Sequence, residues 1–186
     1  MRQYMLEVAK PLMINKGYTA VGLAELVAAV GVPKGSFYYY FRSKEEFGQA
    51  LLEAYFAEYL SAVDNLLMGQ GTAAQRLFDY FRFWVDTQWA AVPDGKCLVV
   101  KLGSEVCDLS EDMRFVLEKG TRSVVERLAR CIEEGQSDGA ISSDVPADAL
   151  AKSLYQMWLG ASLQAKVDNA RAPFDTALSM TKRMLS

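Results

Sequence analysis

The chain has 186 residues, of which 51% are hydrophobic and 23% are charged. These proportions are typical of a folded globular protein and argue against a disordered one. No apolar run approaches the roughly 20 residues that a membrane-spanning helix needs, and the mixed polar N-terminus is not a signal peptide. We therefore expect a cytoplasmic protein.

The chain holds no histidine and only three cysteines, at irregular spacing. This pattern disfavours a disulfide framework, the usual zinc sites and the catalytic triads that depend on histidine. We accordingly expect no metal, no cofactor and no enzymatic activity.

Charge is divided unevenly along the chain. Residues 1–50 hold six basic and four acidic side chains, a net charge of +2, whereas the remainder carries −5. A basic head on an acidic body is typical of a protein whose head binds a polyanion.

Apolar residues recur at helical spacing along nearly the whole chain, which predicts an all-α protein of about nine helices. Gly17 and Gly31 are expected to end the first two helices in the left-handed conformation, and Pro33 suits the first position of the third. Ser43 and Glu46 have the spacing of a capping box. We expect helices over about residues 2–15, 22–29, 33–40, 44–66, 72–91, 96–106, 110–134, 146–167 and 174–185, with a turn at 92–95.

The second and third predicted helices are joined by a short turn that contains Gly31, as in a helix-turn-helix. Phe37 and Phe41 are four residues apart, so they share one face of the third helix and should pack inward. The three successive tyrosines between them cannot all face inward, because neighbouring residues diverge by about 100°. Tyrosine hydroxyls can donate to phosphate oxygens, and tyrosine rings can contact a thymine methyl group.

The segment GYTAVGLAELVAAVGVPKGSFYYYFRSKEEF, residues 17–47, resembles the DNA-binding domain of TetR-family transcriptional repressors. The resemblance implies a TetR-like fold in which residues 1–46 bind DNA and residues 47–186 sense an effector and dimerise. It also implies a palindromic double-stranded DNA operator. The implied DNA contacts are Thr19, Lys34, Gly35, Ser36, Tyr38, Tyr39, Tyr40 and Lys44.

Two positions depart from the family pattern. Tyr40 stands where many members have histidine. Gly22 stands where many have a threonine or serine that holds a phosphate, so that contact must fall to the backbone or to Thr19.

The resemblance further implies a homodimer that forms through the eighth and ninth helices. The eighth helix has a broad apolar surface, and small residues at 160–162 allow close approach of another helix. The apolar residues of this helix are Leu150, Leu154, Met157, Trp158, Ala161 and Leu163.

Residues 95–114 and 154–167 resemble the NemR-like branch of the family, which senses electrophiles and oxidants through a cysteine. Cys107 is favoured as the sensor, because the helix start that Ser110 caps would stabilise a nearby thiolate. Lys166 is the candidate cation beside it, if the two helices cross there. Cys97 is a second candidate, whereas Cys131 falls in an apolar stripe and is interpreted as core.

A second hypothesis keeps the repressor but replaces covalent chemistry by reversible binding of a small aromatic or unsaturated molecule. A sister branch that responds to acrylate shares some of the sequence pattern. The candidate pocket residues are Trp84, Tyr155 and Trp158, for each of which plain core packing is the alternative interpretation. A thiol enzyme with Cys107 as nucleophile is disfavoured, because the chain has no histidine base.

Overall fold

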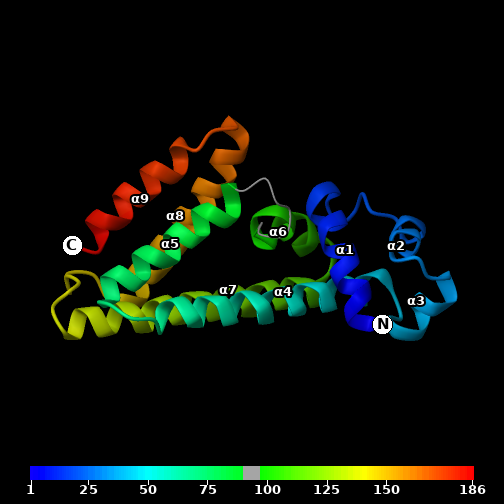
Figure 1. The fold of residues 1–186 in the computed structure, drawn as a ribbon, viewed down its shortest axis with the longest axis horizontal. Coiled ribbons are helices and arrows are strands. Elements are labelled where there is room, and N and C mark those ends of the chain that lie inside the picture. The colour runs from blue at the N-terminus through cyan, green and yellow to red at the C-terminus, as the bar shows by residue number, and fades with distance from the viewer. Residues whose placement is uncertain (90–96) are drawn as a thin grey trace. The chain divides into compact units, whose positions relative to one another are not determined.

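The computed structural model describes residues 1–89 and 97–186, and these ranges contain nine α-helices and no β-strand (Figure 1). The predicted all-α fold is confirmed, and each predicted range overlaps one helix. The turn predicted at 92–95 lies outside the described residues. The helices are α1 (Arg2–Lys16), α2 (Leu23–Val30), α3 (Lys34–Tyr40), α4 (Lys44–Leu67), α5 (Ala73–Trp89), α6 (Leu98–Leu109), α7 (Glu111–Ser137), α8 (Ala147–Asp168) and α9 (Ala172–Met184).

Local sequence signals set several helix ends. Gly31 ends α2 in the left-handed conformation, with φ 75° and ψ 30°, as predicted. The Ser43 hydroxyl accepts the N–H of Glu46 at 3.0 Å, and the Glu46 carboxylate accepts the N–H of Arg42 at 2.7 Å. Ser110 likewise accepts a backbone N–H in the first turn of α7 at 3.3 Å.

Three predicted helix ends differ in detail. Gly17 has φ 92° and ψ 164°, so its backbone is extended with a positive φ rather than left-handed helical. Pro33 and Pro146 each precede the first helical residue, with ψ 149° and 138°. A proline ring fixes φ but leaves ψ free, so both prolines take an extended ψ and cap the helix from outside.

The chain divides into two compact units. The first comprises Met1–Glu58 and Ala91–Gly120, and the second comprises Tyr59–Ala90 and Thr121–Ser186. The helices α4 and α7 each contribute residues to both units. The first unit therefore groups α6 with the three N-terminal helices, and the division predicted at residue 46 falls inside α4.

Phenylalanine side chains form the centre of the N-terminal helical group. Phe37 and Phe41 of the α3 region are 0% and 1% exposed, and their ring centroids lie 5.4 Å apart. Phe47 of α4 lies 5.7 Å from the first ring and 5.0 Å from the second. Both predicted inward-facing phenylalanines thus hold α3 against the start of α4.

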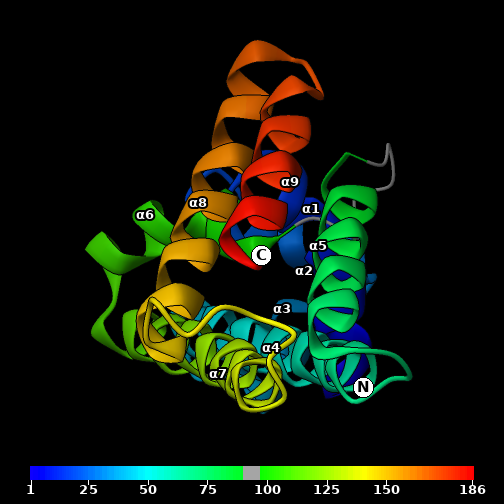
Figure 2. The same cartoon turned by 90° about the vertical axis from the view of Figure 1, so that its left-hand side faces the viewer.

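Stacked aromatic rings form the centre of the second unit, where α8 and α9 run side by side and α5 packs against α9 (Figures 1 and 2). Trp158 of α8 lies 4.8 Å from Phe81 of α5, with the two rings 13° from parallel. Trp158 also stacks with Phe174 of α9, with the ring centroids 6.2 Å apart. No helix within the described ranges is long and apolar enough to cross a membrane.

Candidate nucleic-acid interface and thiol sites

The short helix α3 offers polar and aromatic side chains to solvent. Tyr38 is 48% exposed and Tyr39 is 82% exposed. The Tyr39 ring meets the half-buried Tyr40 ring edge-on at 4.9 Å. The predicted contacts on this helix are all exposed or half-buried: Lys34, Gly35, Ser36, Tyr38, Tyr39 and Tyr40.

Gly35 leaves room for a close approach to the start of α3. A Cβ added at this position would meet no described atom within 4 Å. Packing within the chain therefore does not require glycine here, and the absence of a side chain exposes the backbone to a partner.

Lys44 and Thr19 already have partners within the protein. The Lys44 Nζ donates to the backbone oxygen of Tyr18 at 2.7 Å and lies 4.3 Å from the centre of its ring. Burial lowers the pKa of Lys44, while the nearby Glu105 carboxylate acts in the opposite direction. The Thr19 N–H donates to the same carboxylate at 2.6 Å. The phosphate contacts predicted for both residues stay predictions, and they would require these bonds to open.

Cys97 is the N-cap residue of α6 and is 5% exposed. Burial raises the pKa of its thiol. The sulfur accepts hydrogen bonds from the backbone N–H groups of Val99 and Val100 and from the hydroxyl of Tyr55. These bonds lower the thiol pKa, but by less than burial raises it. The sulfur thus has three donors in a site that water barely reaches, and burial keeps the thiol protonated.

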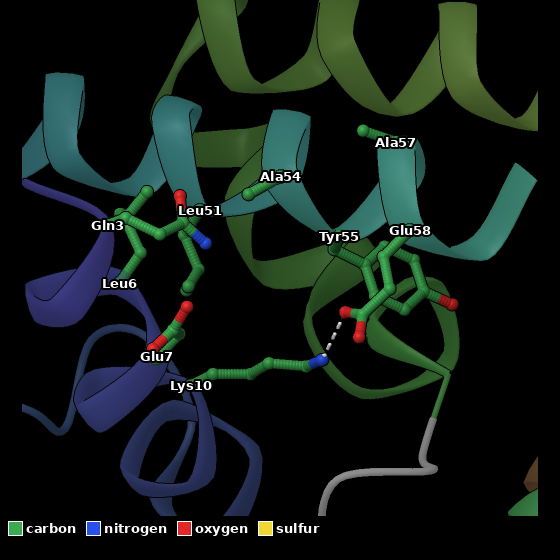
Figure 3. A pocket seen from close by; sticks show the side chains of 9 residues that line it. All are labelled: Gln3, Leu6, Glu7, Lys10, Leu51, Ala54, Tyr55, Ala57 and Glu58. Atoms are coloured by element: carbon green, nitrogen blue, oxygen red, sulfur yellow. Dashed lines mark hydrogen bonds and ion pairs between the residues drawn. The ribbon is translucent and has the colours of Figure 1, made fainter. Parts of the chain in front are cut away.

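Tyr55 also lines a groove of about 610 Å³ between α1 and α4 (Figure 3). Lys10 extends along this groove and its Nζ lies 2.8 Å from Glu58, whose side chain is 74% exposed. Tyr55 therefore contacts both the groove and the Cys97 sulfur. The remaining lining residues are Gln3, Leu6, Glu7, Leu51, Ala54 and Ala57.

The other two cysteines differ in their surroundings. Cys107 lies half-buried in the last turn of α6. Cys131 is 3% exposed, its sulfur lies 3.7 Å from the backbone oxygen of Ala73, and burial raises its pKa to about 11. Cys131 is therefore a core residue, as predicted. Lys166 is an exposed residue of α8 in the second unit, and its predicted proximity to Cys107 stays a prediction.

The three aromatic candidates for an effector pocket are packed core residues in this structure. Trp84 lies 5.7 Å from Tyr155 and 6.2 Å from Trp158, measured between ring centroids. Both indole N–H groups have partners, because Trp84 donates to Ser162 at 2.8 Å and Trp158 donates to Thr181 at 2.9 Å. The effector role of these residues stays a prediction, and an effector there would have to displace these contacts.

Of the apolar residues predicted on the eighth helix, Leu163 is exposed, and Met157 and Ala161 are half-buried. Leu150, Leu154 and Trp158 are buried inside the second unit. Leu163 is 55% exposed, and one turn later Val167 is 70% exposed. Met180 of α9 is 41% exposed.

Glu105 and Tyr55 were not among the predicted site residues. One signal could have pointed to Glu105, which is a charged, half-buried residue that lies between the buried Leu102 and Val106 of α6. No local signal marks Tyr55, because its partner Cys97 is distant in the sequence. Among residues 1–89 and 97–186, no three His, Cys, Asp or Glu side chains are grouped to hold a metal ion.

Comparison with known families agrees with this architecture at both ends of the chain. The model described as bacterial regulatory proteins, tetR family, matches residues 5–51. The model described as tetracyclin repressor-like, C-terminal domain, matches residues 73–181. The chain belongs to the TetR family.

Individual TetR-family proteins resemble the chain over its full length. The HTH-type transcriptional repressor NemR of Escherichia coli strain K12 is 39% identical over 186 residues, which are 100% of this chain and 94% of that protein. The HTH-type transcriptional repressor DhaR of Mycobacterium sp. strain GP1 is 33% identical and aligns with 96% of this chain and 89% of its own length. The predicted resemblance to a NemR-like repressor is thus confirmed.

A solved structure gives the same result for the fold. The crystal structure of E. coli NemR in its reduced form has a TM-score of 0.94 at 38% identity, and the match covers 100% of this chain and 96% of that one. The predicted TetR-like fold is therefore confirmed.

Proposed function

We propose that this chain is a dimeric transcriptional repressor that binds a palindromic operator and releases it when an electrophile or oxidant modifies a cysteine of α6. The observation that carries the DNA-binding part is the division within α3. Phe37 and the adjoining Phe41 are buried, while Tyr38, Tyr39 and Lys34 face solvent. The full-length similarity to a named transcriptional repressor supports the same assignment.

A palindromic site requires two α3 helices about 34–36 Å apart, one turn of DNA. A single chain carries one such helix, so we propose that the repressor acts as a homodimer. The exposed apolar side chains of Leu163 and Val167 on α8 and of Met180 on α9 support these helices as the interface, because a dimer contact would remove them from water.

The sequence favoured Cys107 as the sensor, but the surroundings of the two cysteines of α6 lead us to propose Cys97. Cys107 lies half-buried in the last turn of α6, and Asp108 follows it directly. Cys97 lies at the amino end of the helix, with backbone donors facing its sulfur. A group added at a site with 5% exposure must also displace Tyr55 or the start of α6.

The covalent step needs no residue beyond the thiol. When the start of α6 opens and water enters, the Cys97 thiol gives its proton to solvent, and the thiolate sulfur attacks an electrophilic carbon to form a carbon–sulfur bond. With iodoacetamide as the electrophile, iodide leaves and an acetamide group stays on the sulfur. Cys107 is more exposed, so we expect it to be labelled without releasing DNA.

The proposal is tested with an operator that the protein itself selects. A random-sequence duplex library is enriched on the reduced chain, and operator affinity is measured before and after treatment with iodoacetamide. We expect a palindromic sequence, tight binding by the reduced protein, and release after alkylation in Cys107→Ser but not in Cys97→Ser. Release that disappears only in Cys107→Ser would move the sensor back to Cys107, and no enriched sequence would contradict the repressor itself.

A further inference from the structure

Glu105 of α6 is bound to the loop that precedes α2. Its carboxylate accepts the backbone N–H of Tyr18 at 3.1 Å and that of Thr19 at 2.6 Å, although these residues are 87 and 86 positions away in the sequence. Burial raises the pKa of Glu105, but hydrogen bonds from the Thr19 side chain and from both backbone N–H groups, with the Lys44 charge, outweigh it and hold the pKa below its usual value. Glu105 therefore stays charged.

The backbone of this loop is shaped to receive a carboxylate. Gly17 has φ 92°, a conformation that other residues adopt only with strain. A Cβ added to Gly17 would lie 3.2 Å from the Glu105 Oε2 atom. The glycine thus permits both the turn of the chain and the close approach of the acidic side chain.

Lys44, the first residue of α4, holds the opposite end of the same Tyr18 residue. Its Nζ donates to the Tyr18 backbone oxygen at 2.7 Å, while Glu105 accepts from the Tyr18 N–H. The helix packs tightly here, because a Cβ added at Gly48 would lie 2.6 Å from the Tyr18 ring. Tyr18, 7% exposed, is therefore bonded to α6 on one side and to α4 on the other.

A second side chain of α6 reaches the end of α1. Lys101, one helical turn before Glu105, donates to the backbone oxygen of Asn15 at 3.5 Å. Residues four apart share one face of a helix. This face of α6 is therefore in polar contact with the segment that connects α1 to α2.

We propose that Glu105 is the positioning residue through which α6 controls the placement of the helix-turn-helix. The thiol part of this inference rests on the proposed function. Cys97 begins the same 12-residue helix, and Cys107 follows Glu105 by two residues. A group added to Cys97 that shifts α6 moves the carboxylate away from the loop before α2, and α2 packs against α3. Lys44 is part of the same connection through its bond to the Tyr18 backbone oxygen.

Glu105→Gln is the informative substitution because it keeps the size of the side chain. A carboxylate accepts both N–H groups, whereas the glutamine amide has one accepting oxygen and an NH₂ group that faces the second donor. Glu111→Gln is the matched control, since Glu111 is an exposed residue of α7 that pairs only locally with Arg114 at 3.0 Å.

The first measurement needs no thiol reagent. Hydrogen exchange of the Tyr18 and Thr19 amides is compared in the reduced full-length proteins. We expect exchange in Glu105→Gln to be faster by at least about tenfold, the change that loss of a charge-assisted hydrogen bond predicts, and exchange in Glu111→Gln to match the wild type. Unchanged exchange in Glu105→Gln would overturn the proposal.

The second measurement is the factor by which iodoacetamide weakens operator binding, determined alongside the intact mass. Coupling between sites is typically about 5–150-fold. We expect iodoacetamide to weaken operator binding by a factor in that range for the wild type and for Glu111→Gln. At equal alkylation, binding by Glu105→Gln should weaken by less than about 3-fold. If Glu105 had only a structural role, Glu105→Gln would change the operator affinity of the reduced protein but not the factor by which iodoacetamide weakens binding. A factor in Glu105→Gln as large as that of the wild type would therefore overturn the proposal. If alkylation does not release the wild type, the proposed function fails instead, and the exchange rates decide whether Glu105 holds the loop.

Discussion

Replacing Tyr39 by alanine should weaken operator binding without changing stability. Tyr39 is 82% exposed, and its one described ring contact is with Tyr40 at 4.9 Å. Substitutions at such exposed positions usually change the free energy of unfolding by less than about 0.5 kcal/mol. Loss of a direct DNA contact costs about 1–3 kcal/mol, which corresponds to about a 5- to 150-fold weaker operator affinity.

Phe37→Ala should act mainly on the free energy of unfolding rather than on a direct DNA contact. Phe37 is 0% exposed and packs against two other phenylalanine rings at 5.4 and 5.7 Å. Truncating a buried phenylalanine costs about 3–5 kcal/mol, so this variant should lose stability first and DNA binding as a consequence. Phe115→Ala is the control for an exposed aromatic residue, because Phe115 is 57% exposed but lies on α7.

The assay pairs urea unfolding with fluorescence anisotropy on the selected operator. Each variant is measured under conditions in which unfolding shows it to be folded. If Tyr39→Ala binds the operator as tightly as Phe115→Ala does, or if it unfolds as readily as Phe37→Ala, the assignment of α3 as the DNA-contacting surface is refuted.

Three further predictions concern packing, titration and assembly. Gly120→Ala should cost about 1–3 kcal/mol in the free energy of unfolding, because the added Cβ would lie 2.4 Å from a phenylalanine ring of α4, whereas Gly103→Ala, with its nearest atom at 3.8 Å, should not destabilise the protein. The folded-state pKa of Cys131 is about 11, above its usual value of 9.0, so its contribution to stability is present below pH 9 and lost as the pH rises through 11. Unfolding midpoints from pH 8 to 11 should therefore fall more steeply in wild type than in Cys131→Ala, and parallel slopes would contradict this. Val167→Asp should convert a dimer to a monomer in sedimentation experiments, whereas Met68→Asp, at a 78% exposed site on neither α8 nor α9, should leave the dimer intact.

Helix positions could be predicted because their signals are local. The left-handed Gly31 and the hydroxyl of Ser43 act within one helical turn of themselves, so the printed sequence already contains both partners. The inward faces of Phe37 and Phe41 followed from their spacing alone. The family resemblance rested on the same compact segment.

The contacts that the sequence did not predict join residues far apart in the chain. Glu105 binds Thr19 across 86 positions, and Tyr55 hydrogen-bonds Cys97, which also lies far from it in the sequence. Helical periodicity shows that a residue lies on a given face, but not which distant segment that face meets. For the same reason Lys44 was assigned to DNA from its place in the motif, whereas its amine lies against the Tyr18 carbonyl.

We propose that the state of one thiol on α6 sets operator affinity. The most direct measurement uses the Cys107→Ser/Cys131→Ser variant, in which Cys97 is the sole cysteine, and records intact mass and operator affinity on one sample during iodoacetamide treatment. We predict that affinity falls in proportion to the fraction of protein carrying one acetamide group. Complete alkylation of this protein with operator binding unchanged would contradict the account.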